Sequence, residues 1–448
     1  MNNQGPIRDA RTLGVPKMLI LGLQHMFAMF GATVLVPILV QGYGLPLSIQ
    51  TTLFFAGIGT LFFHVCTKLK IPAFLGSSFA YLGGFSAVAE LDSGIYAGMT
   101  GEEKLPYALG GIVVAGLLYL VLAGLIKLVG VHKVMRFLPP VVTGPIIILI
   151  GLSLAPSAIN NASTNWWLAI LSIAVIVAAN IWGRGMIKII PILLGVLIPY
   201  AVALVTRQVD FSGVAAADFV GLQPFVLAKF DLTSILVMAP IAIAAMMEHI
   251  GDMSAISATV EENFIEDPGL HRTLIGDGIA TSLAGMFGGP ANTTYGENTG
   301  VLELSQVFDP KVVRLAAVYA VVLSFSPKFA AVINSIPTAI IGGVSFILYG
   351  MISAIGVRNV VENRVDFTNS RNLIIAAVIM VCGLGFKIWG FSNEFSGLTF
   401  HIGGTDITLT SLAIAAIAGI ALNAILPGKD YEFGSDVTKG RSGDFGRY

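Results

Sequence analysis

Charged residues are scarce in this sequence. They make up 11% of its 448 residues, whereas an ordinary soluble domain carries about 25%. Hydrophobic residues make up 55%, and the mean hydropathy is +0.84. This composition excludes a soluble enzyme and a nucleic-acid-binding module, and it predicts an integral membrane protein.

Cysteine is almost absent as well. The two cysteines, Cys66 and Cys382, both lie inside apolar stretches. No disulfide framework is therefore expected.

Long apolar runs fill the chain between Pro16 and Leu426. A helix needs about 20 apolar residues to cross a bilayer, whereas barrel strands would alternate with period two. The runs are continuously apolar and predict an all-α polytopic bundle. We expect fourteen segments, at 18–40, 49–67, 74–89, 107–128, 138–156, 166–182, 187–206, 232–252, 272–289, 293–308, 312–333, 337–355, 372–389 and 407–426.

The distribution of positive charge supports this count. With both termini in the cytoplasm, only five of the 25 Lys and Arg residues fall on the far side. These five are Lys104, Arg207, Lys229, Lys328 and Lys387. The third and tenth segments are short and interrupted, so twelve full spans with two re-entrant pieces is the alternative.

Fourteen segments can form two repeats of seven. Because seven is odd, the second repeat would have the opposite orientation in the membrane to the first. Segments broken by Gly and Pro occur at corresponding places in the two halves, at 71–79 and 288–298. In secondary transporters, such paired broken segments mark a substrate site at the bilayer midplane. The alternative, that Gly and Pro are simply common in membrane helices, explains a matched pair less well.

Four acidic residues lie within or at the edge of predicted spans: Glu248, Asp252, Asp277 and Glu297. Each could cost about 2.5 to 3.5 kcal/mol at a helix centre. Glu248 and Asp252 are four apart and share one helix face, with no basic residue in that span. At least one should be protonated at neutral pH, as in a proton carrier. The alternative is that Asp252 only caps a wet helix end.

Tyr295-Gly296-Glu297 would begin a half-helix in the tenth segment, and 77–79 would begin another in the third. Free backbone N–H groups at such starts bind electronegative atoms. Together with carboxylates and an aromatic ring, they suit a small planar molecule with N–H and C=O groups. For Asp277, His249 and His25 we favour structural roles.

Several blocks of sequence resemble one family of transporters, the nucleobase-ascorbate (nucleobase:cation symporter-2) transporters, and among them the bacterial uracil permeases. The likeness covers nearly the whole chain. It rests on Leu23-Gln24-His25, on 29–37, on Gly76-Ser77-Ser78-Phe79-Ala80, on Glu248-His249-Ile250-Gly251, on 267–272 and on 292–298.

This resemblance implies a seven-plus-seven inverted repeat in which segments 3 and 10 are each a short strand plus a half-helix. It implies a homodimer in the bacterial cell membrane and proton-coupled uptake of a nucleobase without a cofactor. The implied parts are a cytoplasmic N-terminal segment 1–17, a core domain of 18–128 and 232–333, a gate domain of 138–206 and 337–426, and a cytoplasmic tail 427–448.

The resemblance also implies roles for individual residues. Substrate-binding residues would be Ala32, Phe79, Glu248, Tyr295, Gly296 and Glu297. Proton coupling would fall to Glu248, Asp252 and Glu297, with His25, Asn298 and Tyr349 in support and no metal.

Two departures from the family pattern leave alternatives open. Asp252 stands where the best-known uracil permeases have a histidine, and the signature around Glu297 does not close with Thr-Arg. Glutamate at 297 favours uracil over a purine. A xanthine or purine symporter is the alternative, and an ion channel is a remote one.

Overall fold

The computed structural model describes residues 6–92, 94–130, 133–134, 136–393, 397–402 and 405–428. Most of the expected tail 427–448 lies outside the described residues. The first half contains α1 (Val15–Gly42), α2 (Ile49–Cys66), α3 (Leu82–Glu90), α4 (Gly101–Val129), α6 (Pro140–Ser163), α7 (Trp166–Ile181), α8 (Met186–Ile189), α9 (Pro191–Val205) and α10 (Ser212–Ala216). The second half contains α11 (Leu232–Met238), α12 (Ile241–Val260), α13 (Leu270–Met286), α14 (Gly296–Ser305), α15 (Pro310–Ser324), α16 (Pro327–Asn334), α17 (Thr338–Glu362), α18 (Ser370–Asn393) and α19 (Ser411–Ile425).

Short elements complete the fold. They are the single turns η1 (Ala10–Leu13), η2 (Phe79–Tyr81), η3 (Gly94–Tyr96) and η4 (Ile265–Gly269), and the strands β1 (Leu75–Ser77), β2 (Asn292–Thr294), β3 (Gly397–Ile402) and β4 (Thr405–Thr410).

Local sequence explains where many helices begin. Proline occupies the first position of α6, α9, α15 and α16, where its missing N–H has no helical partner to lose. At the start of α4, Thr100 and Glu103 form a capping box.

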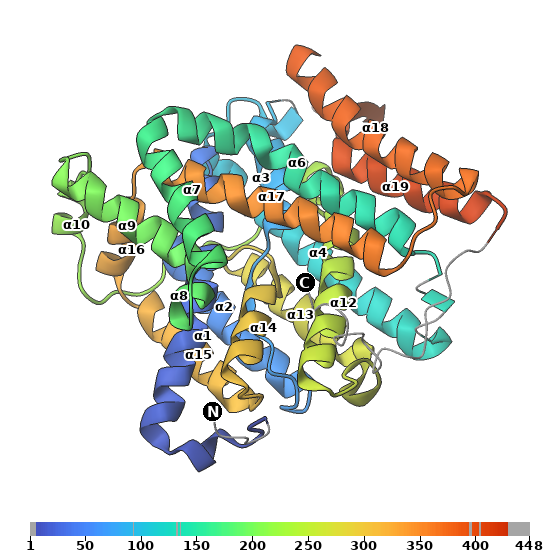
Figure 1. The fold of residues 1–448 in the computed structure, drawn as a ribbon. Coiled ribbons are helices and arrows are strands. Elements are labelled where there is room, and N and C mark those ends of the chain that lie inside the picture. The colour runs from blue at the N-terminus through green and yellow to red at the C-terminus, as the bar shows by residue number, and fades with distance from the viewer. Residues whose placement is uncertain are drawn as a thin grey trace.

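The long helices pack in two groups. In one, α4 lies against α13 and α2 against α15; in the other, α6 lies along α17 and α7 against α9 (Figure 1). Gly151 lets α6 approach α17 closely, since a Cβ there would lie 2.2 Å from the Tyr349 carbonyl oxygen. Small residues at such contacts are the usual means of packing helices in a membrane.

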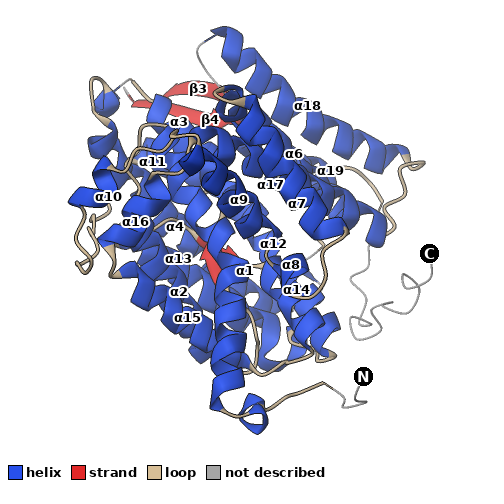
Figure 2. Ribbon diagram, turned by 60° about the vertical axis from the view of Figure 1, so that its left-hand side comes forward, coloured by secondary structure: helices blue, strands red, loops and turns tan. Residues whose placement is uncertain are grey.

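Two separate strand pairs interrupt the helices. β1 and β2 pair antiparallel in the middle of the bundle, and the β3–β4 hairpin lies at one end (Figure 2). The short strands in the third and tenth segments thus agree with expectation. The hairpin was not expected: the predicted span 407–426 begins inside β4, and α19 begins only at Ser411.

Seven helices of the described chain are long and apolar enough to cross a membrane, or eight if one bent pair is counted. The chain is therefore a multi-pass helical membrane protein, and the count of fourteen remains a prediction. The expected span 312–333 is not straight, because α15 and α16 meet at 88° where Ser326 and Pro327 start a new helix. Likewise, Pro191 separates α8 from α9 within the expected 187–206.

Candidate functional site

Two helix starts flank the β1–β2 pair. β1 leads into η2, which begins at Phe79, and β2 leads into α14, which begins at Gly296. The register pairs Leu75 with Thr294 and Ser77 with Asn292, so the two helices leave from opposite ends of the pair. The backbone N–H groups at both starts have no intrahelical acceptor and can bind an electronegative atom.

Tyr295 fastens this strand pair to α1. Its hydroxyl donates to the Ser77 carbonyl oxygen at 2.9 Å and lies 3.3 Å from the Thr33 hydroxyl. Its ring covers Gly76, where an added Cβ would lie 2.3 Å from two ring carbons. Tyr295 is 4% exposed, and Ala32, which precedes Thr33, is fully buried.

Asp252 joins α12 to the junction of β2 and α14. The Thr294 hydroxyl donates to Asp252 Oδ2 at 3.0 Å, and a Cβ at Gly296 would lie 3.9 Å from Asp252 Oδ1. The interpretation of Asp252 as only a cap of a wet helix end does not describe this contact. Asp252 instead accepts a hydrogen bond from the last residue of β2, two residues before α14 begins.

Glu248 lies one turn before Asp252 on α12, with Asp252 and Glu297 among its charged neighbours. All three residues are half-buried, and Gly296 beside them is exposed. Neither α12 nor α14 contains Lys or Arg. The structure thus gathers three acids around an accessible helix start, with no cation on their own helices.

His249 and Asp277 form a second buried pair. The distance from His249 Nδ1 to Asp277 Oδ2 is 2.9 Å, and both side chains are fully buried. The ring of Phe63 meets the imidazole edge to face, with centroids 6.2 Å apart. The contact between His249 and Asp277 joins α12 to α13, in agreement with the structural roles expected for both residues.

Hydrogen bonds of the Asn298 side chain join α14 to α1. Its amide nitrogen lies 3.2 Å from His25 Nδ1 and 3.1 Å from the His25 carbonyl oxygen. His25 is fully buried and Asn298 is 1% exposed. This contact joins α14 to α1, and the supporting role expected for both residues stays a prediction.

Tyr349 lies apart from these residues. It is 2% exposed on α17, in the group of helices that contains α6. Its expected supporting role therefore stays a prediction. Within the described ranges, no cluster of three His, Cys, Asp or Glu side chains has the geometry of a metal site.

Reasoning from the sequence missed three contributions to this site. Two are the hydroxyl groups of Thr33 and Thr294, which contact Tyr295 and Asp252. The third is the contact between Asp277 and His249, which the sequence analysis did not predict. A threonine in an apolar helix gives no distinctive signal. The presence of Asp277 in the ninth segment and His249 in the eighth could have suggested that they form a pair, but not the geometry of that pair.

Comparison with known proteins gives consistent results. A model of the Permease family matches residues 16–390. The uracil permease of Bacillus caldolyticus is 41% identical over 438 residues, which are 94% of this chain and 94% of that protein. The uracil permease of Escherichia coli K12 is 36% identical over 90% of each chain.

Solved structures of other transporters share the fold. The transmembrane domain of the cyanobacterial bicarbonate transporter BicA superposes with a TM-score of 0.61 at 15% identity, over 93% of this chain and 99% of that one. The murine anion transporter Slc26a9 in its inward-facing state gives a TM-score of 0.63 at 9% identity, over 92% and 68%. At these identities the likeness concerns the fold alone.

Proposed function

Since the chain belongs to the nucleobase-ascorbate (nucleobase:cation symporter-2) family of permeases, we propose that it imports uracil by proton symport across the bacterial plasma membrane. It is a transporter rather than an enzyme. One observation carries this proposal: the N-terminus of α14, at Gly296, lies beside the carboxyl groups of Glu248, Asp252 and Glu297.

Uracil carries alternating N–H and C=O groups on a flat ring. Backbone N–H groups of Phe79 and Gly296 would donate to its carbonyls, and Glu248 and Glu297 would accept from its ring nitrogens. The Phe79 and Tyr295 rings and Ala32 would form the apolar walls. The high identity to uracil permeases supports a pyrimidine over a purine.

The coupling ion in this proposal is a proton. Three carboxyl groups share a partly dehydrated region without a cation on α12 or α14, so full ionisation of all three would be costly. Protonation of Glu248, Asp252 or Glu297 would neutralise the site and allow it to cross the barrier. No cofactor is needed.

Transport would occur by movement of a core domain (18–128 and 232–333) against a gate domain (138–206 and 337–426). The packing of α4 on α13 and α2 on α15, separate from α6 on α17 and α7 on α9, supports this division. The proposal includes fourteen segments in a seven-plus-seven inverted repeat, cytoplasmic termini and a homodimer.

The test is uptake of labelled uracil by proteoliposomes, with and without an inward proton gradient. We expect saturable, gradient-dependent uptake that unlabelled uracil inhibits and sulfate does not. Inhibition by xanthine at equal concentration would indicate a purine carrier, and non-saturable flux would indicate a channel. Full gradient dependence in Glu248→Gln would remove that residue from the coupling mechanism.

A further inference from the structure

The described chain before α1, residues 6–14, lies across the ends of other helices. We call it the N-terminal strap. The Ile7 amide donates to the Gln306 carbonyl oxygen, and the Phe308 amide donates to the Ile7 carbonyl oxygen, both at 2.8 Å. These two bonds attach the strap to the residues that follow α14 immediately.

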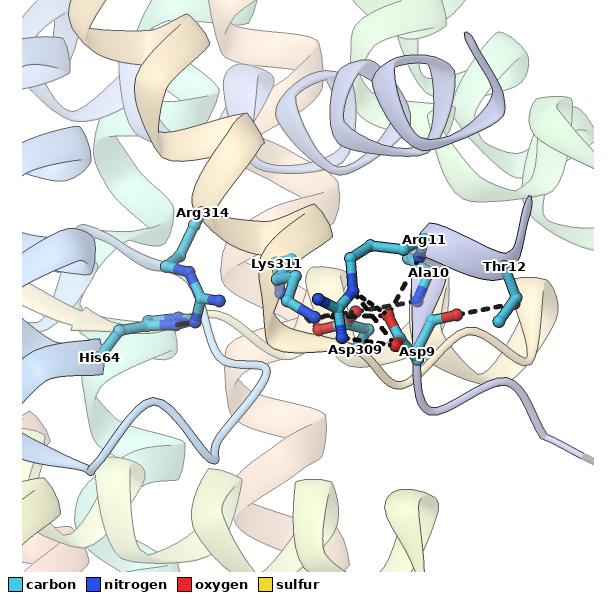
Figure 3. A network of polar contacts seen from close by, with 8 residues as sticks. All are labelled: Asp9, Ala10, Arg11, Thr12, His64, Asp309, Lys311 and Arg314. Atoms are coloured by element: carbon cyan, nitrogen blue, oxygen red, sulfur yellow. Dashed lines mark hydrogen bonds and ion pairs between the residues drawn. The ribbon is translucent and has the colours of Figure 1, made fainter. Parts of the chain in front are cut away.

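A buried carboxylate fixes the next part of the strap. Asp309 is 3% exposed, and its Oδ2 accepts from the Ala10 amide at 2.8 Å (Figure 3). Lys311 Nζ lies 3.3 Å from both Asp309 Oδ2 and Asp9 Oδ1. A buried carboxylate needs such partners. Detaching the strap would remove the Ala10 donor and leave Asp309 with Lys311 alone.

Arg8 attaches the strap to a different helix. Its guanidinium donates to the Val260 carbonyl oxygen at 2.8 Å and forms an ion pair with Glu262. Val260 is the last residue of α12, where a cation is favourable because the helix dipole is negative at that end. The strap therefore joins the C-terminal ends of α12 and α14.

These are the two helices that carry the acids of the candidate site. Near Glu248, the bond from Thr294 to Asp252 joins α12 to the end of β2, two residues before α14 begins, and the strap joins the far ends of the two helices. Two rigid helices that are joined at one point can change the angle between them. A second connection at their far ends, here the strap, restrains that angle.

We propose that the N-terminal strap sets the angle between α12 and α14, and that Ile7 and Arg8 are thereby positioning residues for Glu248 and Glu297. This inference rests on the proposed function for its effect on uracil. Its structural part, the restraint of two helices, does not depend on the substrate.

The first test measures the restraint directly. Spin labels at Ala258 on α12 and Glu303 on α14, both exposed, would report the distance between the helices after replacement of Cys66 and Cys382. We expect a narrow distance distribution in the otherwise unaltered protein. Arg8→Ala removes the α12 attachment and Ile7→Pro removes the N–H that binds α14, so each should broaden the distribution.

Arg11→Ala is the matched control. Arg11 lies on the strap and its hydrogen bonds go to Asp9, not to α12 or α14. It should leave the distance distribution unchanged. Arg8→Lys, which keeps the charge at the end of α12, should restore most of the narrow distribution.

The second test measures uracil uptake by the same variants. We expect Arg8→Ala and Ile7→Pro to raise the KM for uracil roughly three- to tenfold, with kcat within about twofold. Arg8→Ala removes a hydrogen bond and an exposed ion pair, and Ile7→Pro removes one hydrogen bond. Lower thermal stability with unchanged KM and unchanged distances would overturn the proposal. If the unaltered protein takes up no uracil, the proposed function fails, and the distance measurement still decides the role of the strap.

Discussion

Thr294 donates its hydroxyl hydrogen to Asp252, and this 3.0 Å bond joins the end of β2 to the middle of α12. The bond fixes a carboxyl oxygen beside the first residue of α14. It explains how an acid outside the broken segment takes part in shaping the helix start.

Thr294→Val should therefore weaken uracil uptake. The variant keeps the shape of the side chain but removes the donor, at a cost of about 0.5 to 1.5 kcal/mol, or roughly two- to tenfold in KM. Thr293→Val is the control, because the Thr293 hydroxyl is buried without a partner in the described structure. Equal KM values for the two variants would show that the bond to Asp252 has no bearing on the site.

Gly76→Ala should destabilise the protein. The new Cβ would lie 2.3 Å from the Tyr295 ring, which is held by bonds to Ser77 and Thr33 and cannot move freely. Overpacking of this kind costs about 1 to 3 kcal/mol. The measurement is the midpoint of thermal unfolding in detergent, with Gly124→Ala on α4 as the control, since a Cβ there meets no neighbour within 4 Å.

The buried pair of His249 and Asp277 should be more sensitive to the loss of one partner than to the loss of both. Asp277→Leu alone leaves the imidazole buried and unpaired, a loss of about 1 to 3 kcal/mol. The double variant His249→Leu with Asp277→Leu removes both polar groups and should recover much of that stability. Thermal unfolding of the two variants compares them, and a double variant less stable than the single one would contradict this account.

The loop before α13 should lose stability in acid. Its Asp267 accepts a hydrogen bond from Lys70, which together with the nearby charges of Lys70 and Lys68 lowers the pKa of that carboxyl. Because the folded pKa lies below the unfolded value of about 3.9, the stabilisation is complete above that pH. It is lost as the pH falls through the folded pKa.

Asp267→Asn tests this dependence. Its unfolding midpoint should lie below that of the unaltered protein at neutral pH, and the difference should shrink at acid pH and at high salt. Glu266→Gln, at the exposed neighbouring position, should show no such change. A difference that persists in strong acid would mean that the carboxylate charge is not its source.

Much of the helical arrangement could be predicted from apolar length alone. The expected spans overlap the observed helices because a run of about 20 apolar residues is long enough to cross a bilayer as a helix. The broken segments could also be predicted, because Gly and Pro interrupt both at matching places. The bend at Ser326 was missed, since a serine and a proline within an apolar run indicate a kink without its angle.

The side-chain contacts of the site could not be predicted. Spacing on α12 places Glu248 and Asp252 on one face, but it does not indicate that Thr294 approaches Asp252 or that Asp277 approaches His249. Each contact depends on how two helices pack, which the period of one helix does not encode. The β3–β4 hairpin was missed for a different reason, because β3 lies in the expected loop between 389 and 407 and most of β4 was included in the expected span 407–426.

The pairing of Leu75 with Thr294 has a consequence for synthesis. A ribosome that has made β1 must complete most of the remaining chain before β2 exists, and until then the N–H and C=O groups of β1 lack their strand partner. Unpaired backbone groups are costly in the bilayer interior. The first half of the nascent chain must therefore shield the backbone of β1 from lipid. Chains truncated before β2 should be degraded by cellular proteases.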